Sequence, residues 1–203
     1  MVKLGFNNTN TTLINNGNYT LFNTTIIVKE ERQINITNLR IINTNNEPIF
    51  IINNSGNLIT NSTLISNGTN LTVIKINGNG EEDYNLNLTN VNIDVNGNKT
   101  TKLAEINNGY LRITYSSLII TGKEIITFDN NYTKVVVSNN NITLNGETVT
   151  FMNNDYTKEV YTVSYNNINV TAKNPVSLIH IRKWNIYEHY RTYWIIQCFT
   201  WRC

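Results

Sequence analysis

The stretch "LNLTNVNIDVNGN", which begins at Leu86, contains the pattern from which the fold can be predicted. Asn-rich tracts by themselves are typical of disordered, low-complexity sequence. Here, however, apolar residues alternate with polar ones: Leu86 and Leu88 precede Asn90, and Ile93 and Val95 follow it. A period of two predicts strands with one buried face. Asn90 is then expected at a bend between two strands, because Asn tolerates the left-handed backbone conformation.

The composition of the whole chain favours an all-β protein. Among 203 residues there are 41 Asn and only two Ala, and charged residues make up 15%. Ile, Thr, Val and Tyr, which favour strands, are plentiful. A formal net charge of +2 predicts no nucleic-acid partner, and no apolar run is long enough for a transmembrane segment. The first residues lack the apolar stretch of a signal peptide, so we expect either a cytosolic chain or an export signal outside this sequence.

A six-residue pattern recurs along the chain: apolar, Thr/Ser, Asn/Tyr, two residues, then Ile/Leu. Its copies are "ITNLRI", "ITNSTL", "LTNVNI", "ITYSSL", "VSNNNI" and "VSYNNI", separated by steps of 23, 29, 25, 24 and 26 residues. The Asn/Tyr positions are predicted to form a structural ladder at the bends: Asn38, Asn61, Asn90, Tyr115, Asn139 and Tyr165. The apolar first positions should stack in the core: Ile36, Ile59, Leu88, Ile113, Val137 and Val163. The Thr/Ser positions should form an outward column of hydroxyls: Thr37, Thr60, Thr89, Thr114, Ser138 and Ser164.

A second motif with the same period lies between these copies: "IFIINN", "VIKING", "LAEINN", "IITFDN" and "VTFMNN". Two motifs that share one period predict a repeat architecture, and three short strands per repeat match a parallel β-helix. The sequence therefore predicts a single right-handed, single-stranded parallel β-helix over residues 1–176, with about seven coils of about 24 residues.

Coils such as "INITNLRIINTNN" and "VVVSNNNITLNGE" resemble those of the adhesin-like, right-handed parallel β-helix proteins of methanogenic archaea. The resemblance covers roughly residues 10 to 175. It implies an exported protein displayed at the cell surface, although the chain has neither a visible signal peptide nor an anchor. This departure from the family suggests that the chain is a fragment.

The chain contains 14 Asn-x-Ser/Thr sequons, which are candidate N-glycosylation sites. An outward strand face with period two also generates such triplets without any glycosylation, so both readings stay open. The sequons singled out are those of Asn18, Asn23, Asn35, Asn61, Asn87, Asn131, Asn141 and Asn169.

A catalytic interpretation requires two carboxylates on one exposed sheet. Aligning the second motif places Glu105 and Asp129 one coil and two residues apart, about 8 Å, which is in the range of an inverting glycosidase pair. The same alignment places Thr127 and Phe151 on the outer face. The short turns that follow Asn107 and Asp129 supply no walls for a cleft, so we predict that neither acid is catalytic and that both are open to water.

Other chemistry is not predicted. Both His and both Cys lie near the end of the chain, at His180, His189, Cys198 and Cys203, which leaves no nucleophilic triad in the coils. The segment "DNNYT" lacks the carboxylate density of a calcium site, and no metal or cofactor is predicted.

The composition changes after Pro175. Residues 177–203 form an atypical aromatic and basic tail that contains every Trp of the chain. Three interpretations are open: a cap on the end of the helix, an interaction segment, or translation in a shifted frame, which we slightly favour. For the chain as a whole we expect a non-catalytic, extracellular adhesin-like or carbohydrate-associated module whose partners are host or microbial surface glycans or proteins. The alternative is a polysaccharide-active lyase or glycoside hydrolase.

Overall fold

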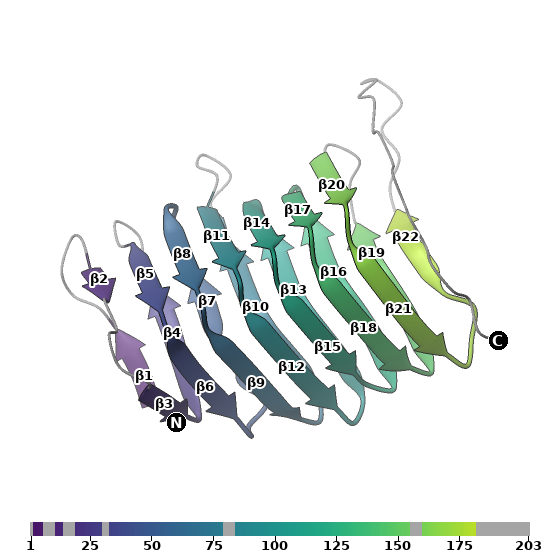
Figure 1. Ribbon diagram of the computed structural model, residues 1–203, viewed down its shortest axis with the longest axis horizontal. Coiled ribbons are helices and arrows are strands. Elements are labelled where there is room, and N and C mark those ends of the chain that lie inside the picture. The colour runs from purple at the N-terminus through teal and green to yellow at the C-terminus, as the bar shows by residue number, and fades with distance from the viewer. Residues whose placement is uncertain are drawn as a thin grey trace.

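The structure, a computed structural model, describes residues 2–5, 11–13, 19–29, 33–78, 84–154 and 160–181. Within these residues the chain forms 22 β-strands and no helix. Every third strand joins the same sheet, and all the pairings within the sheets are parallel (Figure 1). The strands stack as a β-solenoid of about six turns of roughly 24 residues, and the remaining strands extend the stack at its ends. The prediction of an all-β parallel solenoid is confirmed.

Three sheets form the walls of the solenoid. Sheet A contains β1 (Val2–Gly5), β4 (Thr24–Val28), β7 (Phe50–Ile52), β10 (Leu71–Asn77), β13 (Thr100–Asn107), β16 (Glu124–Asn131), β19 (Thr148–Asn154) and β22 (Ser177–Ile181). Sheet B contains β2 (Thr11–Leu13), β5 (Ile34–Thr37), β8 (Asn57–Thr60), β11 (Tyr84–Thr89), β14 (Gly109–Thr114), β17 (Lys134–Ser138) and β20 (Val160–Ser164). Sheet C contains β3 (Tyr19–Phe22), β6 (Leu39–Asn43), β9 (Thr63–Gly68), β12 (Asn92–Gly97), β15 (Ser117–Thr121), β18 (Asn141–Gly146) and β21 (Asn167–Ala172).

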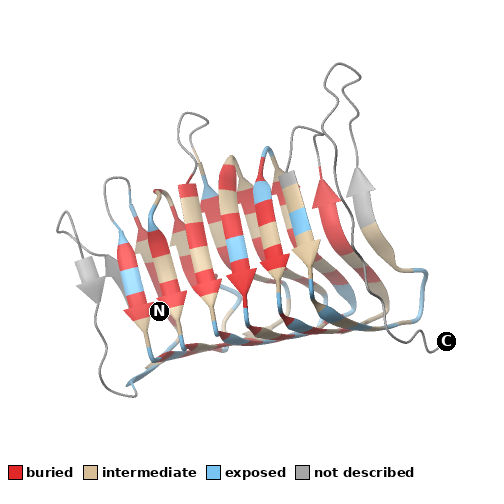
Figure 2. Ribbon diagram, turned by 45° about the horizontal axis from the view of Figure 1, so that its top comes forward, coloured by how far each residue is buried: buried red, intermediate tan, exposed pale blue. Residues whose placement is uncertain are grey.

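The core consists of apolar columns that run along the stack. The predicted column from Ile36 to Val163 is confirmed, because each of its members is the direct register partner of the next. Its first five residues are fully buried, and Val163 is partly buried against the same cluster. Figure 2 shows the resulting alternation of buried and more exposed residues along the strands.

The strands of sheet A bend at a point where two consecutive side chains face inward. In β13 these are Leu103 and Ala104, and in β16 they are Thr127 and Phe128. The rings of Phe128 and Phe151 meet edge to face, with centroids 5.4 Å apart. The prediction that Thr127 and Phe151 face outward is therefore wrong: both are buried, because the inward pair shifts the period-two pattern by one residue.

Polar side chains close the inner corner between sheets B and C. After several bends, the next residue accepts a hydrogen bond from a backbone N–H in the preceding coil: Ser62 Oγ from Leu39, and Ser116 Oγ from Val91. Asn140 Oδ1 likewise accepts from the N–H of Ser116 at 2.8 Å. These bonds satisfy donors that would otherwise be buried without a partner.

The last described strand, β22, pairs with β19, so sheet A continues past residue 176. The rest of the predicted tail, residues 182–203, including His189, Cys198 and Cys203, lies outside the described residues.

Two neighbouring isoleucines of β15 allow a matched test of the core. Ile120 is fully buried between Val95 and Leu144, whereas Ile119 points outward and is 43% exposed. Ile120→Ala is expected to lower the free energy of unfolding by about 2–5 kcal/mol, because it removes buried methyl groups and leaves a cavity. Ile119→Ala should cost less than about 1 kcal/mol. Urea unfolding measures both, and equal losses would contradict the assignment of the two faces.

Candidate functional site

The outer face of sheet A carries the greatest concentration of charge among the described strands. One column, in direct register, reads Ile51, Lys75, Glu105, Asp129 and Asn153. Glu105 and Asp129 are therefore immediate register partners on neighbouring strands, whose spacing is about 4.8 Å. The predicted offset of two residues and separation of about 8 Å are therefore wrong. The two carboxylates do not have the wider separation that an inverting glycosidase requires.

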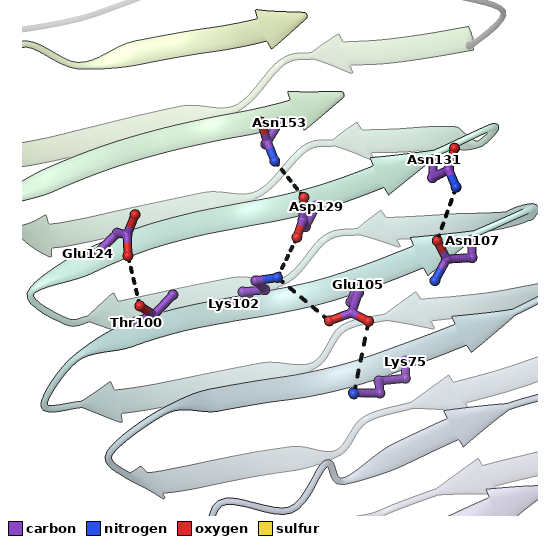
Figure 3. Close-up of polar contacts among 9 residues, drawn as sticks. All are labelled: Lys75, Thr100, Lys102, Glu105, Asn107, Glu124, Asp129, Asn131 and Asn153. Atoms are coloured by element: carbon purple, nitrogen blue, oxygen red, sulfur yellow. Dashed lines mark hydrogen bonds and ion pairs between the residues drawn. The ribbon is translucent and has the colours of Figure 1, made fainter. Parts of the chain in front are cut away.

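Lys102 lies beside both acids (Figure 3). Its Nζ donates a hydrogen bond to Asp129 Oδ2 and lies 3.6 Å from Glu105 Oε2. The other oxygen of Glu105 lies 3.9 Å from Lys75 Nζ, and the other oxygen of Asp129 accepts a 2.6 Å hydrogen bond from Asn153. All four carboxylate oxygens thus face a cation or an amide donor. The two positive and two negative charges of the cluster cancel.

Lys102 could not be recognised from the sequence, for a geometric reason. In a regular strand, residues three apart point to opposite faces, so Lys102 and Glu105 would not meet. Because Leu103 and Ala104 both face inward at the bend of β13, Lys102 and Glu105 emerge on the same outer face. The side chains of Glu105 and Asp129 are only partly open to water, with 33% and 23% of their surface exposed.

The charged cluster perturbs Lys102. Burial alone would lower the pKa of its ammonium group, but the hydrogen bond and negative charge of Asp129, with a smaller contribution from Glu105, outweigh that effect. The net result is a pKa raised above the usual 10.5. Lys102 therefore remains charged at neutral pH and acts as a permanent counter-ion rather than as a proton donor.

Asn residues extend this surface on one side. Asn77 Nδ2 donates to Asn53 Oδ1 at 3.3 Å, and Asn131 Nδ2 donates to Asn107 Oδ1 at 3.4 Å. Asn107 and Asn131 lie in the next outward column of the sheet beyond the acids. These side-chain amide bonds link neighbouring coils, as do the Asn ladders of cross-β assemblies.

A shallow depression of about 240 Å³ lies at the corner between sheets C and A. It is lined by Lys99, Thr100, Lys123, Glu124, Glu147 and Thr148, and includes neither Glu105 nor Asp129. Thr100 Oγ1 donates a 2.7 Å hydrogen bond to Glu124 Oε2. The hydrogen bond and charge of Lys173 lower the pKa of Glu147. Both acids that line the depression, Glu124 and Glu147, are therefore already bonded to other side chains of the protein.

All six residues of the sequence-derived bend ladder have positive φ. The values for Asn38, Asn61, Asn90, Tyr115, Asn139 and Tyr165 lie between 48° and 58°. Asn90 Nδ2 donates a 2.7 Å hydrogen bond to Asn61 Oδ1 in the preceding coil. Tyr115 and Tyr165 are 65% and 76% exposed. In the hydroxyl column beside the bends, Thr89 Oγ1 and Thr114 Oγ1 are 3.1 Å apart, within hydrogen-bond distance.

The sequons differ in their access to solvent. Four of their Asn residues are exposed: Asn35, Asn61, Asn141 and Asn169. Three are half-buried, at Asn23, Asn87 and Asn131, whereas Asn18 lies outside the described residues. In the described part of the chain, no group of three or more His, Cys, Asp or Glu is arranged to hold a metal ion. None of the described residues belongs to a helix that could cross a membrane.

No protein-family model matches the chain, and no curated protein or solved structure is detectably similar to it. The resemblance to adhesin-like proteins therefore rests on the coil motifs alone. Any functional argument has to come from the surfaces themselves.

The bend ladder can be tested at Asn90. Asn90→Leu is expected to lower the free energy of unfolding by about 1–3 kcal/mol, because it removes the amide bonded to Asn61 and disfavours positive φ. Asn90→Gly, which keeps the left-handed conformation and removes only the amide, should cost less. Urea unfolding separates the two effects, and a Leu variant as stable as the parent would argue against a structural role for the ladder.

The raised pKa of Lys102 predicts a pH dependence of stability. A lysine whose pKa is higher in the folded than in the unfolded chain stabilises the fold fully below its unfolded pKa, and this contribution disappears as pH rises through the folded value. Lys102→Met should therefore be less stable than the parent by about 1 kcal/mol at pH 7, since the pair is partly exposed.

The difference between the parent and Lys102→Met should shrink above pH 10.5. Comparing the two proteins at each pH cancels the titration of the other lysines and the tyrosines. Lys99→Met, which alters an exposed lysine away from the cluster, serves as the control. A parent-to-variant difference that is constant from pH 7 to pH 12 would contradict the proposed pairing of Lys102.

Proposed function

We propose that this chain is a non-catalytic, adhesin-like β-solenoid displayed at the cell surface, and that it binds glycans or proteins through the outer faces of its sheets. The proposal includes a right-handed winding, since crossovers between parallel strands are right-handed in nearly all proteins, and about seven coils. It also includes an extracellular location, with the exposed sequons of Asn35, Asn61, Asn141 and Asn169 as the preferred N-glycosylation sites.

The observation that carries the proposal is the neutralisation of Glu105 and Asp129. A glycosidase needs one carboxylic acid held protonated in a desolvated environment. Here, both acids lie among two lysines and an amide on an outward strand face. Such a cluster is poorly suited to donating a proton, because its carboxylates are already paired within the protein.

Repetition supports the same conclusion. Each outward column places a side chain at about 4.8 Å intervals along the stack, which gives a long surface with a regular spacing rather than one reactive centre. Repeat proteins commonly use extended surfaces of this kind for binding. A linear polymer or a dense array of surface groups is the type of partner that can contact several coils at once.

The competing function is a polysaccharide lyase or glycoside hydrolase that uses Glu105 and Asp129. It requires that the ion pairs with Lys75 and Lys102 open when substrate binds, which would cost the energy of those pairs. The adhesin proposal requires no such rearrangement.

A glycan array probed with the purified protein tests the proposal. We expect binding to a subset of surface glycans, with the same pattern and strength for the double variant Glu105→Gln/Asp129→Asn, whose side chains keep nearly the same shape. Parent and variant should release no sugar ends from a panel of polysaccharides. The reverse result, release of reducing or unsaturated ends that disappears in Glu105→Gln, would refute the adhesin proposal and establish the enzyme.

A further inference from the structure

Three bulky aromatic residues occupy bends where the backbone is left-handed. Tyr115, Tyr132 and Tyr165 have φ values of 53°, 53° and 55°. Asn occupies the corresponding bends of neighbouring coils, for example Asn90 and Asn139 beside Tyr115. Asn adopts this conformation readily, whereas a bulky side chain there is an outlier. An unfavourable conformation that the fold maintains is grounds for a functional hypothesis.

Two of these tyrosines contribute little to the core. Tyr115 and Tyr165 are 65% and 76% exposed, at the corner between sheets B and C. Replacing Asn by Tyr at these bends therefore adds conformational strain without a compensating burial of the ring. Large exposed aromatic groups commonly mark binding surfaces. Their exposure suggests that the rings contact a ligand.

The spacing of the two rings suits an extended polymer. Asn139 lies between Tyr115 and Tyr165 in the bend column, so the tyrosines are two coils apart. With strands about 4.8 Å apart, their Cα atoms are separated by about 10 Å. That separation is comparable to the length of a disaccharide unit in an extended chain. The short side chain of Asn139 leaves the space between the rings open, so that every second sugar can stack its apolar C–H face on a tyrosine.

The adjoining outer face of sheet B is positively charged. None of the described strands of this sheet contains Asp or Glu, whereas β14 contributes the exposed Arg112 and β17 contributes Lys134. Lys134 Nζ lies 5.2 Å from the centre of the Tyr110 ring, which fixes the lysine on this face. The charges of sheet A, in contrast, cancel within the cluster around Lys102. Sheet B therefore attracts anions, and Arg112 can bind a carboxylate with two parallel hydrogen bonds.

We propose that the outer face of β14, β17 and β20 binds an extended anionic polysaccharide, with sugar rings stacked on Tyr115 and Tyr165, a uronate carboxylate paired with Arg112, and Lys134 adding to the positive charge that attracts the polymer. This inference rests on the proposed glycan-binding function and specifies its face and ligand class. Single-stranded nucleic acid also stacks on aromatic side chains, but it carries a phosphate on every nucleotide. A polysaccharide instead presents hydroxyl groups on every sugar, which can form hydrogen bonds with the column of Thr and Ser hydroxyls beside the bends.

The experiment uses three polysaccharides that contain uronate: polymannuronate and polygalacturonate, with a carboxylate on every sugar, and hyaluronate, with a carboxylate on every second sugar. Each is compared with its carboxyl-reduced form, which has the same linkages without the charge. Binding to the purified full chain is measured by isothermal titration calorimetry. We expect at least one of the charged polymers to bind more tightly than its reduced form, and this preference to weaken with salt.

The variant Tyr115→Asn/Tyr165→Asn removes both rings while placing at each bend the residue that neighbouring coils use there. It should weaken binding about tenfold or more, as loss of an aromatic anchor does at other binding surfaces, without lowering the melting temperature. Tyr19→Asn removes a tyrosine that is equally exposed, at 65%, but lies on β3 of sheet C. This control should bind as the parent does. Arg112→Gln/Lys134→Gln should abolish the preference for the charged form.

The outcomes separate this inference from the function on which it rests. Glycan binding that is unchanged in the double tyrosine variant, or that favours the reduced polymers, would overturn the assignment of face and ligand but leave the proposed function standing. Failure to bind any glycan, charged or neutral, would overturn this inference together with the glycan-binding part of the proposed function. Tighter binding of a single-stranded oligonucleotide that depends on Tyr115 and Tyr165 would replace the polysaccharide with a nucleic acid.

Discussion

The stacking of each coil on the next in parallel register is the constraint on which the rest of this structure depends. Each strand bonds to the equivalent strands of the neighbouring coils, so every coil must follow the same path as the one before it, about 4.8 Å further along the stack. Bends break this regularity and leave buried N–H groups. Ser62, Ser116 and Asn140 satisfy those donors with short side chains that accept hydrogen bonds from the preceding coil. The abundance of Asn is thus partly a consequence of the need to pair backbone groups at every corner.

Asn has two structural roles in the same coil. At Asn38, Asn61 and Asn90 it supplies a backbone with positive φ, and inside the corner it supplies hydrogen-bond acceptors and donors. Neither role requires anything of the outer surface. Outward columns are consequently free to vary, and the Tyr residues at bends of positive φ are the places where the chain departs from the structurally preferred residue. Asn at a bend is explained by the fold alone, whereas Tyr at a bend is not, so the Tyr positions are the ones at which a ligand is the better explanation.

The sequence predicted the parts of the fold that depend on period two and on bend chemistry. The column from Ile36 to Val163 and the left-handed bends follow from the spacing of apolar and Asn residues. It did not predict the register of Glu105 and Asp129, because a pattern of alternating residues gives no sign of two consecutive inward side chains. Thr127 and Phe128 form such a pair, and one of them is polar, which hid the bend. The same feature hid Lys102, whose pairing with Glu105 exists only because β13 bends between them.

The two charged faces differ in a way that bears on recognition. On sheet A, Lys75 and Lys102 are used in pairing the acids of the same sheet, so a ligand would have to displace those contacts before gaining any of its own. On sheet B, Arg112 and Lys134 have no acidic residue in any described strand of their sheet. Long-range attraction of an anion is therefore directed to sheet B, although sheet A has more charged residues. The backbone of a solenoid presents the same groups in every coil, so it cannot distinguish one face from another. The faces differ instead in the net charge of each sheet and in the bulky residues at the corners.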